Sequence, residues 1–482
     1  MAAKDFIVAI ELGSSKMTGI AGRKNLDGSI NVLAVVKEDS SSFIRKGVVY
    51  NIDKTALCLT NIISKLTSLL KTEITQVYVG VGGQSIRGVR NVISRDLPAD
   101  TKVTQEMVID LMDANRNMKY PDMEILDAAA QEYRVDSQLQ VDPVGIQCSR
   151  LEGNYLNILE RKAFYKNLNK CFETAGINVA EMFLAPLALA DSVLTEGERR
   201  SGCALIDIGA DTTTVSVFTK NILRHLAVIP LGSANITKDI ASLQMEEEEA
   251  EKMKLKYGCA YTDNAEIDNS LMLPIDSERS VESRKFIEIV EGRLEEIIEN
   301  AWYQVPAEYN DKLLGGIILT GGGSNMKNIE RAFMNHTHIE KIRVAKTVTH
   351  TIHFPNPDAG AKNGTMNTVL GLLAKGDINC AGGDVAEGGD LFGGTKATQT
   401  PGEQRVKARQ PHEIPPGTVP TEAEKQQAEE AARLKREEEE RLELERKAEE
   451  ERKAEEERKR NSPLNKGLRW LKDFGKKLVA EE

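Results

Sequence analysis

The sequence predicts an α/β fold, and three features lead to this prediction. Short apolar, β-branched runs alternate with helical patterns up to about residue 376, which is typical of layered α/β domains. The strand-like runs lie far apart in the chain, at 6–10, 77–81, 204–208, 214–218 and 316–320. A strand followed by an acidic residue, one further residue and glycine occurs twice, ending at Gly13 and at Gly209. The 482 residues leave room for several domains.

Composition excludes some classes of protein. The formal net charge is -11, so the chain is not expected to bind nucleic acid, which requires a basic surface. The six cysteines are scattered without a CxxC pair, as in a cytosolic protein with reduced thiols. No signal peptide and no run of 18 apolar residues is found, so any membrane contact is expected at the surface.

The first segment with chemical meaning is 7–16, a strand that leads directly into Gly13, Ser14 and Ser15. Small residues allow backbone amides to approach phosphate oxygens, and Lys16 supplies a countercharge. Alone this signal is weak, because turns of this kind are common.

The second segment, 205–218, repeats the pattern as strand, tight loop and strand. Asp207 stands at the strand end, where a carboxylate can hold the water shell of Mg²⁺. In the third segment, 317–326, a strand precedes Gly321, Gly322 and Gly323. These glycines favour a close backbone approach to a ligand over an ordinary flexible turn. Neither a Walker motif nor a GxGxxG pattern with its acidic partner is present.

Together these segments resemble the two phosphate motifs and the adenosine motif of the actin, Hsp70 and sugar-kinase superfamily. Within it, further segments are similar to the FtsA family of bacterial cell-division proteins. Residues 183–195 and 367–373 are similar to its two connecting helices. Residues 237–258 are similar to its nucleotide-facing subdomain 2B, and residues 77–159 to its family-specific subdomain 1C. The resemblance covers about residues 5–376 and the last 20.

The resemblance implies an actin-like ATPase fold, with two related α/β halves around a nucleotide cleft and an FtsA-type subdomain 1C. It implies ATP and Mg as cofactors, with at most slow hydrolysis. The implied phosphate ligands are Gly13, Ser14, Ser15, Lys16, Gly209 and Thr212. Glu251 and Lys254 are expected at the ribose, Gly321–Gly323 beneath the adenine, and Glu11 and Asp207 at the metal through water.

The second phosphate loop departs from the pattern of many relatives, because it reads Gly209-Ala210-Asp211-Thr212 where they have three glycines and threonine. Ala210 restricts the backbone, and Asp211 is expected to place a carboxylate near phosphate charge.

The expected subdomains follow from the resemblance and divide the chain into ten segments. They are 1A in three parts (1–84, 161–198 and 359–376), 1C (85–160), 2A in two parts (199–234 and 312–358), 2B (235–311), a disordered linker (377–421), a charged helical spacer (422–460) and a membrane-targeting helix (462–482).

The spacer has a six-residue repeat that cannot keep an apolar seam on one helix face, so a solvated single helix is favoured over a coiled coil. The helix that follows is amphipathic at 100° per residue. Its expected membrane residues are Leu468, Trp470, Leu471, Phe474, Leu478, Lys472 and Lys476. An anionic membrane surface is the expected partner, and packing on the protein's own body is the alternative.

The resemblance also implies partners. The tail of the tubulin-like FtsZ is expected to bind subdomain 2B at Arg293 and Glu296. Further copies of the chain are expected to join it in a polymer, and later division proteins are expected to bind subdomain 1C. The predicted function is an ATP-binding scaffold that tethers FtsZ to the cytoplasmic face of the inner membrane at the septum. A sugar-kinase-type phosphotransferase, an Hsp70-like chaperone or another actin-like cytoskeletal ATPase are the alternatives. The first lacks an identifiable catalytic carboxylate, and the chaperone lacks a substrate-binding β-domain.

Overall fold

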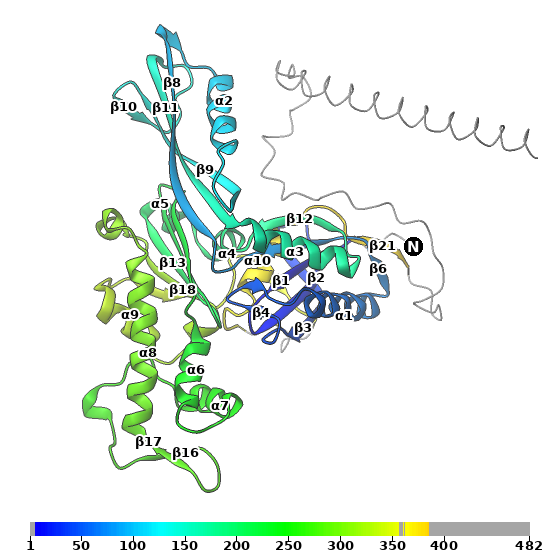
Figure 1. The fold of residues 1–482 in the computed structure, drawn as a ribbon, viewed down its shortest axis with the longest axis vertical. Helices are drawn as coiled ribbons and strands as arrows, with labels where there is room; N and C mark the ends of the chain where they lie inside the picture. Colours follow the sequence, from blue (N-terminus) through cyan, green and yellow to red (C-terminus); the bar gives the residue numbers. More distant parts are fainter. Residues whose placement is uncertain (1–4, 356–359, 361, 385–482) are drawn as a thin grey trace, which may run out of the picture. The chain divides into compact units, whose positions relative to one another are not determined.

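A computed structural model describes residues 5–355, 360 and 362–384. The first half is built on a six-stranded sheet in the order β12-β7-β1-β2-β3-β20 (Figure 1). Its strands are β1 (Ile7–Leu12), β2 (Lys16–Lys24), β3 (Ile30–Asp39), β7 (Val77–Val81), β12 (Val179–Leu184) and β20 (Ile352–His353). The helices of this half are α1 (Ile52–Leu70), α3 (Lys162–Ala175), α4 (Ala185–Val193) and α10 (Asn367–Lys375), with the short hairpin β4 (Ile44–Arg45) and β5 (Val48–Val49).

The second half is built on part of a nine-stranded sheet in the order β10-β9-β11-β8-β15-β14-β13-β18-β19. Its own strands are β13 (Cys203–Ile208), β14 (Thr213–Thr219), β15 (Ile222–Ile229), β18 (Gly316–Thr320) and β19 (Ile342–Val344). Its helices are α5 (Glu196–Ser201), α6 (Ser233–Ala241), α7 (Glu247–Tyr257), α8 (Ser283–Tyr303) and α9 (Ile329–Thr337), with the hairpin β16 (Met272–Pro274) and β17 (Ser280–Glu282).

The two halves repeat one topology. Strand β1 lies between parallel β7 and antiparallel β2, and strand β13 lies between parallel β18 and antiparallel β14. The repeat places Glu11 and Asp207 at equivalent positions, each one residue before the end of its strand. The two related α/β halves that the resemblance implies are therefore confirmed.

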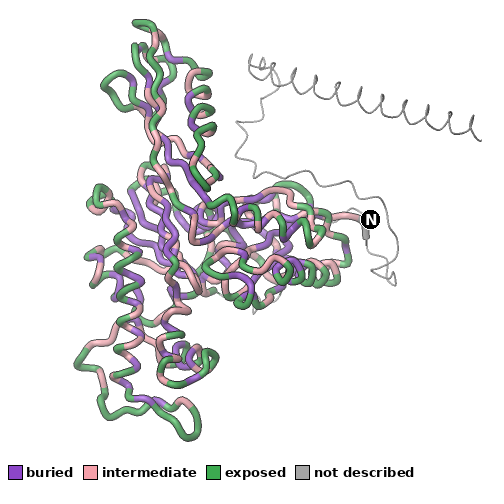
Figure 2. Tube along the Cα trace, in the orientation of Figure 1, coloured by how far each residue is buried: buried purple, intermediate pink, exposed green. Residues whose placement is uncertain are grey.

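All five strand-like runs named from the sequence are strands, because each supplies a buried apolar stretch to a sheet. Buried residues gather along these strands in both halves, whereas the β16–β17 hairpin is mostly exposed (Figure 2). Helix α8 buries one apolar face, formed by Phe286, Val290, Leu294, Ile297, Ile298 and Ala301.

Helices α4 and α10 pack against one another, as expected for two connecting helices. Gly371 makes this contact possible, because a β-carbon there would lie 2.4 Å from the carbonyl oxygen of Ala188. Any side chain at this position would force the helices apart.

The inserted region consists of β8 (Arg87–Lys102), α2 (Gln105–Arg116), β9 (Met123–Val135), β10 (Gln138–Gln140) and β11 (Gln147–Arg161). It leaves and re-enters the first half, yet β8 pairs with β15 of the second half at Arg87 and Ala227. The buried Arg224 adds an ion pair to Glu132, with 3.0 Å between Nη2 and Oε1. The insertion is thus tied to both halves.

The prediction of a disordered linker from residue 377 onward is wrong for residues 377–384. Strand β21 (Ala381–Asp384) pairs with β6 (Thr72–Ile74), and the Tyr78 hydroxyl donates to Asp377 Oδ1 at 2.8 Å. The Cys380 amide donates to the Phe6 carbonyl at 2.8 Å, and Cys380 is buried. The polar composition of the segment concealed these few contacts. The rest of the expected linker, the spacer and the amphipathic helix, with all seven expected membrane residues, lie outside the described residues.

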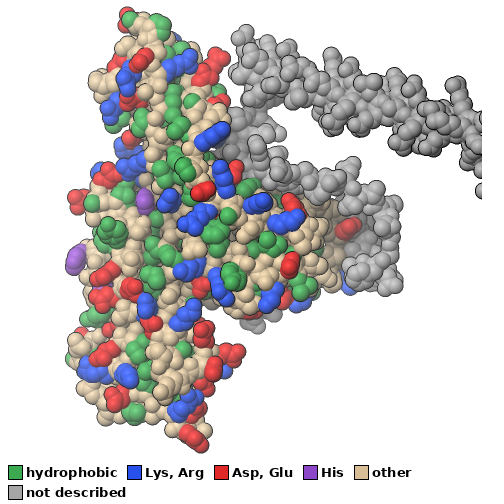
Figure 3. All heavy atoms as spheres, viewed as in Figure 1, with side chains coloured by type: hydrophobic (Ala, Val, Ile, Leu, Met, Phe, Trp, Pro, Cys, Tyr) green, Lys and Arg blue, Asp and Glu red, His purple; other side chains and the backbone are tan. Residues whose placement is uncertain are grey.

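None of the described helices is long and apolar enough to cross a membrane. All six cysteines are free thiols, and five of them are buried. On the face shown in Figure 3, acidic and basic side chains both occur over most of the surface.

Candidate functional site

A cleft of about 790 Å³ lies between the two halves, in the range of sites for drug-sized ligands. It is lined by the ends of the central strands, the loops that follow them and helices α6 and α7. All thirteen residues predicted to hold nucleotide or metal line it: Glu11, Gly13, Ser14, Ser15, Lys16, Asp207, Gly209, Thr212, Glu251, Lys254, Gly321, Gly322 and Gly323. Their roles toward a ligand remain predictions.

Loop one is the turn between β1 and β2. Gly13 is required there, because a β-carbon would lie 2.6 Å from the carbonyl oxygen of Lys16. The turn is held from behind by Ser40, whose hydroxyl donates to the Gly13 carbonyl at 2.6 Å. In the described part of the chain, the amides of Ser14 and Ser15 donate no hydrogen bond to another protein group. They are therefore available to an anion in the cleft.

Loop two is the turn between β13 and β14, and it is anchored to the start of α6. The Gly209 amide donates to the Thr212 carbonyl at 2.8 Å, which closes the turn. The amides of Ser233 and Ala234 donate to the carbonyls of Gly209 and Ala210 at 2.9 and 2.8 Å. The first turn of α6 thus fixes the loop, while the amides of Ala210 and Asp211 have no partner among the described residues.

Glu11 and Asp207 bring two carboxyl groups into the cleft from opposite halves. Burial, and next the charge of Asp207, raise the pKa of Glu11 to about 7, although Lys16 and a hydrogen bond with Thr368 act in the other direction. Burial raises the pKa of Asp207 to about 6. Two carboxylates that resist ionisation together gain most from a divalent cation, since the cation removes their mutual repulsion.

The glycine turn after β18 packs against loop two. A β-carbon at Gly321 would lie 2.3 Å from Asp207 Oδ1, and one at Gly323 would lie 2.4 Å from Ile208 Cγ2. Gly321 also has φ of 84°, which favours glycine. Gly322 differs, because a β-carbon there meets only Thr365 at 3.7 Å. A side chain at Gly322 would therefore enter the cleft and leave the fold intact.

Helix α7 brings Glu251 and Lys254 to the cleft wall. Lys254 is buried, and its ammonium group contacts three oxygens: the Ser233 carbonyl at 3.1 Å, the Thr237 hydroxyl at 2.8 Å and Glu251 Oε2 at 2.7 Å. This lysine ties α7 to the first turn of α6. Glu251 is more exposed than Lys254, so the predicted ribose contact falls mainly on Glu251.

Several cleft residues were not found from the sequence. Loop two is supported by Ser233 and Ala234, and the wall near the glycine turn contains Asn325, Met326, Lys327, Thr365 and Thr368. A signal for the first pair exists in Gly232-Ser233, a small-residue helix start after a buried strand. Nothing in the sequence indicates that 363–368 folds back against β18.

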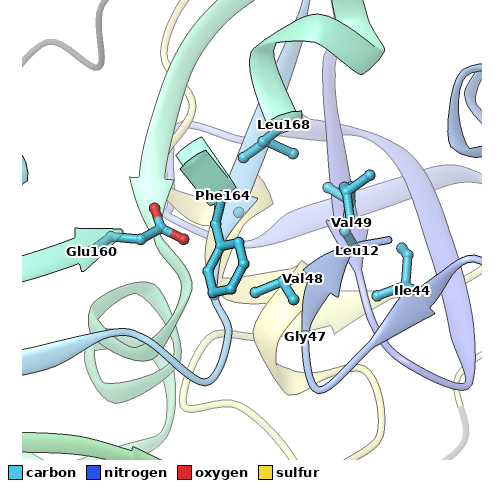
Figure 4. Close-up of a pocket in the computed structure, with 10 residues that line it drawn as sticks. Leu12, Ile44, Gly47, Val48, Val49, Glu160, Phe164 and Leu168 are labelled. Carbon is cyan, nitrogen blue, oxygen red and sulfur yellow. The ribbon is translucent and has the colours of Figure 1, made fainter. Parts of the chain in front are cut away.

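A second, small cavity of about 20 Å³ lies beside the cleft, with room for a single water molecule. Glu160 and Phe164 lie on one side of it, and Leu12, Ile44 and Val49 on the other (Figure 4). Glu160 is 2% exposed, and its Oε2 has no hydrogen-bond partner. Burial raises the pKa of Glu160 to about 8, so this acid is protonated at neutral pH.

An open groove of about 350 Å³ between α6 and α8 holds both predicted partner residues, Arg293 and Glu296. Asp239, Ser242, Ile289 and Gly292 complete its lining. Arg293 is paired with both Asp239 and Glu296, and the Arg293 Nη2 to Asp239 Oδ1 distance is 3.2 Å. These acidic neighbours raise the pKa of Arg293. The Arg293 guanidinium therefore links α8 to α6 and also lines the groove.

Comparison with known proteins identifies relatives over the same region. A family model described as "Cell division protein FtsA" matches residues 204–371, and one described as "SHS2 domain inserted in FTSA" matches residues 83–159. Cell division protein FtsA of Porphyromonas gingivalis is 32% identical over 326 residues, which cover 66% of this chain and 68% of that protein. Cell division protein FtsA of Escherichia coli K12 is 28% identical over 389 residues, covering 77% and 90%.

Among solved structures, a chain of the PilM-PilN type IV pilus biogenesis complex superposes with a TM-score of 0.54. It covers 76% of this chain and 97% of its own length at 15% identity. A likeness at this identity is one of fold.

Proposed function

This chain belongs to the FtsA family of cell division proteins and has its actin-like fold, and from this we propose that it is an ATP-binding scaffold that tethers FtsZ filaments to the cytoplasmic membrane. In this proposal the chain works at the division septum as a peripheral membrane protein, forms polymers with itself and recruits later division proteins through subdomain 1C. The proposed subdomain boundaries are those expected from the sequence, with the linker starting after residue 384.

The main observation that supports nucleotide binding is that two related loops, one from each half, line the same cleft. Each loop offers amides without protein partners, Ser14 and Ser15 from one half and Ala210 and Asp211 from the other. Amides of this kind bind phosphate oxygens. Gly13 and Gly321 keep the turns that line the cleft tight, since a β-carbon at either position would collide with neighbouring protein atoms.

The donor set also suits magnesium, which prefers carboxylate oxygens and retains several waters. Glu11 and Asp207 would hold the ion, and when bound it would neutralise the phosphate charge. Lys16 lies close enough to Glu11 to lower its pKa, so it is placed to balance charge at loop one. No described residue is assigned as a catalytic base, and slow hydrolysis at most is proposed.

The FtsZ tail is proposed to bind the groove between α6 and α8. The groove has an apolar wall at Ile289, a floor without side chain at Gly292 and a cation at Arg293. A short peptide with acidic and apolar residues matches these features. Because Arg293 already contacts Asp239 and Glu296, an acidic group of the peptide would have to share its guanidinium.

Membrane attachment is proposed from the sequence of residues 464–479. Leu468, Trp470, Leu471, Phe474 and Leu478 fall on one side of a helix, opposite Lys472 and Lys476. A basic amphipathic helix with aromatic residues on its apolar face binds the headgroup region of anionic membranes. One such helix binds reversibly, so stable attachment depends on several anchors in one polymer.

The test is co-sedimentation of purified FtsZ with anionic liposomes in the presence of the full chain and Mg·ATP. The proposal expects FtsZ in the liposome pellet with the full chain and FtsZ in the supernatant with a truncation ending at Arg460. If FtsZ stays in the supernatant with the full chain as well as with the truncation, while both proteins remain folded, this result would contradict the tethering function.

A further inference from the structure

A two-residue turn in the first half bonds to both loops of the cleft. The turn joins β4 and β5 through Lys46 and Gly47. The Lys46 amide donates to Asp211 Oδ2 of loop two at 3.1 Å, and the Gly47 amide donates to Ser14 Oγ of loop one at 2.8 Å. The Lys46 amide therefore joins the two halves at the rim of the cleft, and the Gly47 amide anchors the turn to loop one of its own half.

The backbone of this turn is the one that its length requires. Lys46 has φ of 51° and Gly47 has φ of 73°, the positive values that the type I′ turn of a two-residue hairpin loop needs at both positions. A β-carbon at Gly47 would lie 2.8 Å from Gly83 Cα. The Lys46 carbonyl accepts from the Gln84 amide at 3.0 Å, so the turn also contacts the point where the chain leaves for the insertion.

Behind the turn lies the small cavity of Figure 4, which Gly47 and Val48 help to line. The turn thus has the cleft on one side and unfilled space on the other. Since packed interiors resist displacement, a void at this position makes a small movement of the turn less costly than elsewhere in the core.

Asp211 is the residue that distinguishes this loop two. From the sequence, its carboxylate was expected beside phosphate charge. In the structure Asp211 does not line the cleft, because its carboxylate is directed across the rim to the Lys46 amide. Its charge is nevertheless bound to the loop whose amides face the cleft, and no Lys or Arg side chain pairs with it among the described ion pairs.

We propose that Asp211 makes the cleft discriminate against the terminal phosphoryl group of a nucleoside triphosphate, by occupying the Lys46 amide and placing a negative charge beside that group. This inference rests on the proposed nucleotide binding. The adenosine end is placed at Gly321–Gly323, so the terminal phosphoryl is the part that reaches between loop one, loop two and the turn. A diphosphate leaves the Asp211–Lys46 bond intact, whereas a triphosphate adds charge next to the carboxylate and displaces it.

Two substitutions separate charge from hydrogen bonding. Asp211→Asn keeps the size and one acceptor oxygen and removes the charge, and Asp211→Gly removes both. Asp263→Asn, in a different loop and outside the cleft lining, is the matched control. Calorimetric titrations of full-length protein with Mg·ATP and Mg·ADP give the ratio of the two affinities. Hydrogen exchange at the Lys46 amide, measured without nucleotide, reports the bond itself.

The expected result is a preference for ATP over ADP that rises about tenfold in Asp211→Asn and Asp211→Gly, a factor that lies between the effect of one unit charge a few ångströms away in water and its effect near a protein surface. The Lys46 amide should exchange faster in Asp211→Gly and remain protected in the Asp263→Asn control. An unchanged ATP to ADP ratio in both variants, with both nucleotides bound, would overturn the inference and leave the proposed function standing. Absence of binding of either nucleotide to wild type and both variants would overturn the proposed function, and the inference with it.

Discussion

Glu11 and Asp207 face one cleft from equivalent strands of the two halves, and the charge of Asp207 contributes to the raised pKa of Glu11. The protein therefore holds two acidic groups where ionised carboxylates are unfavourable. Such a pair costs stability in the absence of a cation and favours cation binding. It is a functional arrangement that opposes folding stability.

This relationship gives the first prediction. Asp207→Asn should raise the free energy of unfolding of the nucleotide-free protein by about 1 kcal/mol, because one partly buried charge is removed. The same variant should lose the additional stabilisation that Mg·ATP gives to wild type. Urea unfolding with and without Mg·ATP measures both effects. The remote exposed carboxyl of Glu299 provides the control Glu299→Gln, and equal behaviour of Asp207→Asn and this control would contradict the assignment.

The second prediction concerns the buried acid Glu160. Its pKa is raised to about 8 in the folded protein from 4.5, so the folded state binds more protons than the unfolded state between these values. The contribution of Glu160 to the free energy of unfolding should therefore be greatest below about pH 4.5. It should decrease as the pH rises to 8, by at most about 1.4 kcal/mol per pH unit.

Glu160→Gln should remove this contribution and be the more stable protein at pH 8. The measurement is the difference in unfolding free energy between wild type and variant at pH 6, 7 and 8. A difference that does not change with pH would show that Glu160 has an ordinary pKa.

The third prediction tests the groove on subdomain 2B. Arg293 is a poor first target, because its pair with Asp239 also joins α6 to α8 and its pair with Glu296 lies within α8. Gly292 is better, since a β-carbon there meets nothing within 4 Å. Gly292→Trp should fill the groove and weaken binding of an FtsZ tail peptide at least about tenfold.

Gly292→Ala is the matched control. It should retain the peptide and gain about 0.5–1 kcal/mol of stability, because glycine is unfavourable within a helix. Fluorescence anisotropy of a labelled tail peptide measures the affinities. Undiminished binding to Gly292→Trp would place the peptide elsewhere.

The fourth prediction concerns the membrane. Trp470→Glu or Leu471→Glu should release the full chain from anionic liposomes, because a charge on the apolar face opposes insertion. Asp473→Glu, on the opposite face of the same helix, should have no effect. High salt should weaken binding of wild type only in part, since apolar insertion is not screened. Complete release of wild type by salt alone would mean that charge is the sole attraction.

Much of the fold could be predicted from the sequence, because its strands are local apolar runs. The strands before Gly13, Gly209 and Gly321 could be recognised for this reason, and topology then brings their ends to one cleft. Long-range contacts could not be predicted in this way. The bond from Lys46 to Asp211 joins residues far apart in the chain, and the pairing of β21 with β6 depends on short segments without a hydrophobic pattern. Lys254 shows a different limit, because the resemblance implies a ligand contact for it, whereas its hydrogen bonds to Ser233 and Thr237 of α6 could not be predicted from the sequence.

The most direct test of the account is calorimetric titration of the full chain with Mg·ATP, in wild type, Gly322→Ala and Gly322→Asp. Gly322 is the glycine of the turn at which a side chain has room, so neither substitution should disturb the fold. We predict micromolar binding to wild type, similar binding to Gly322→Ala, and a loss of at least about tenfold in Gly322→Asp through bulk and charge next to the nucleotide. Equal affinity of wild type and Gly322→Asp, with both proteins folded, would contradict the placement of ATP in this cleft.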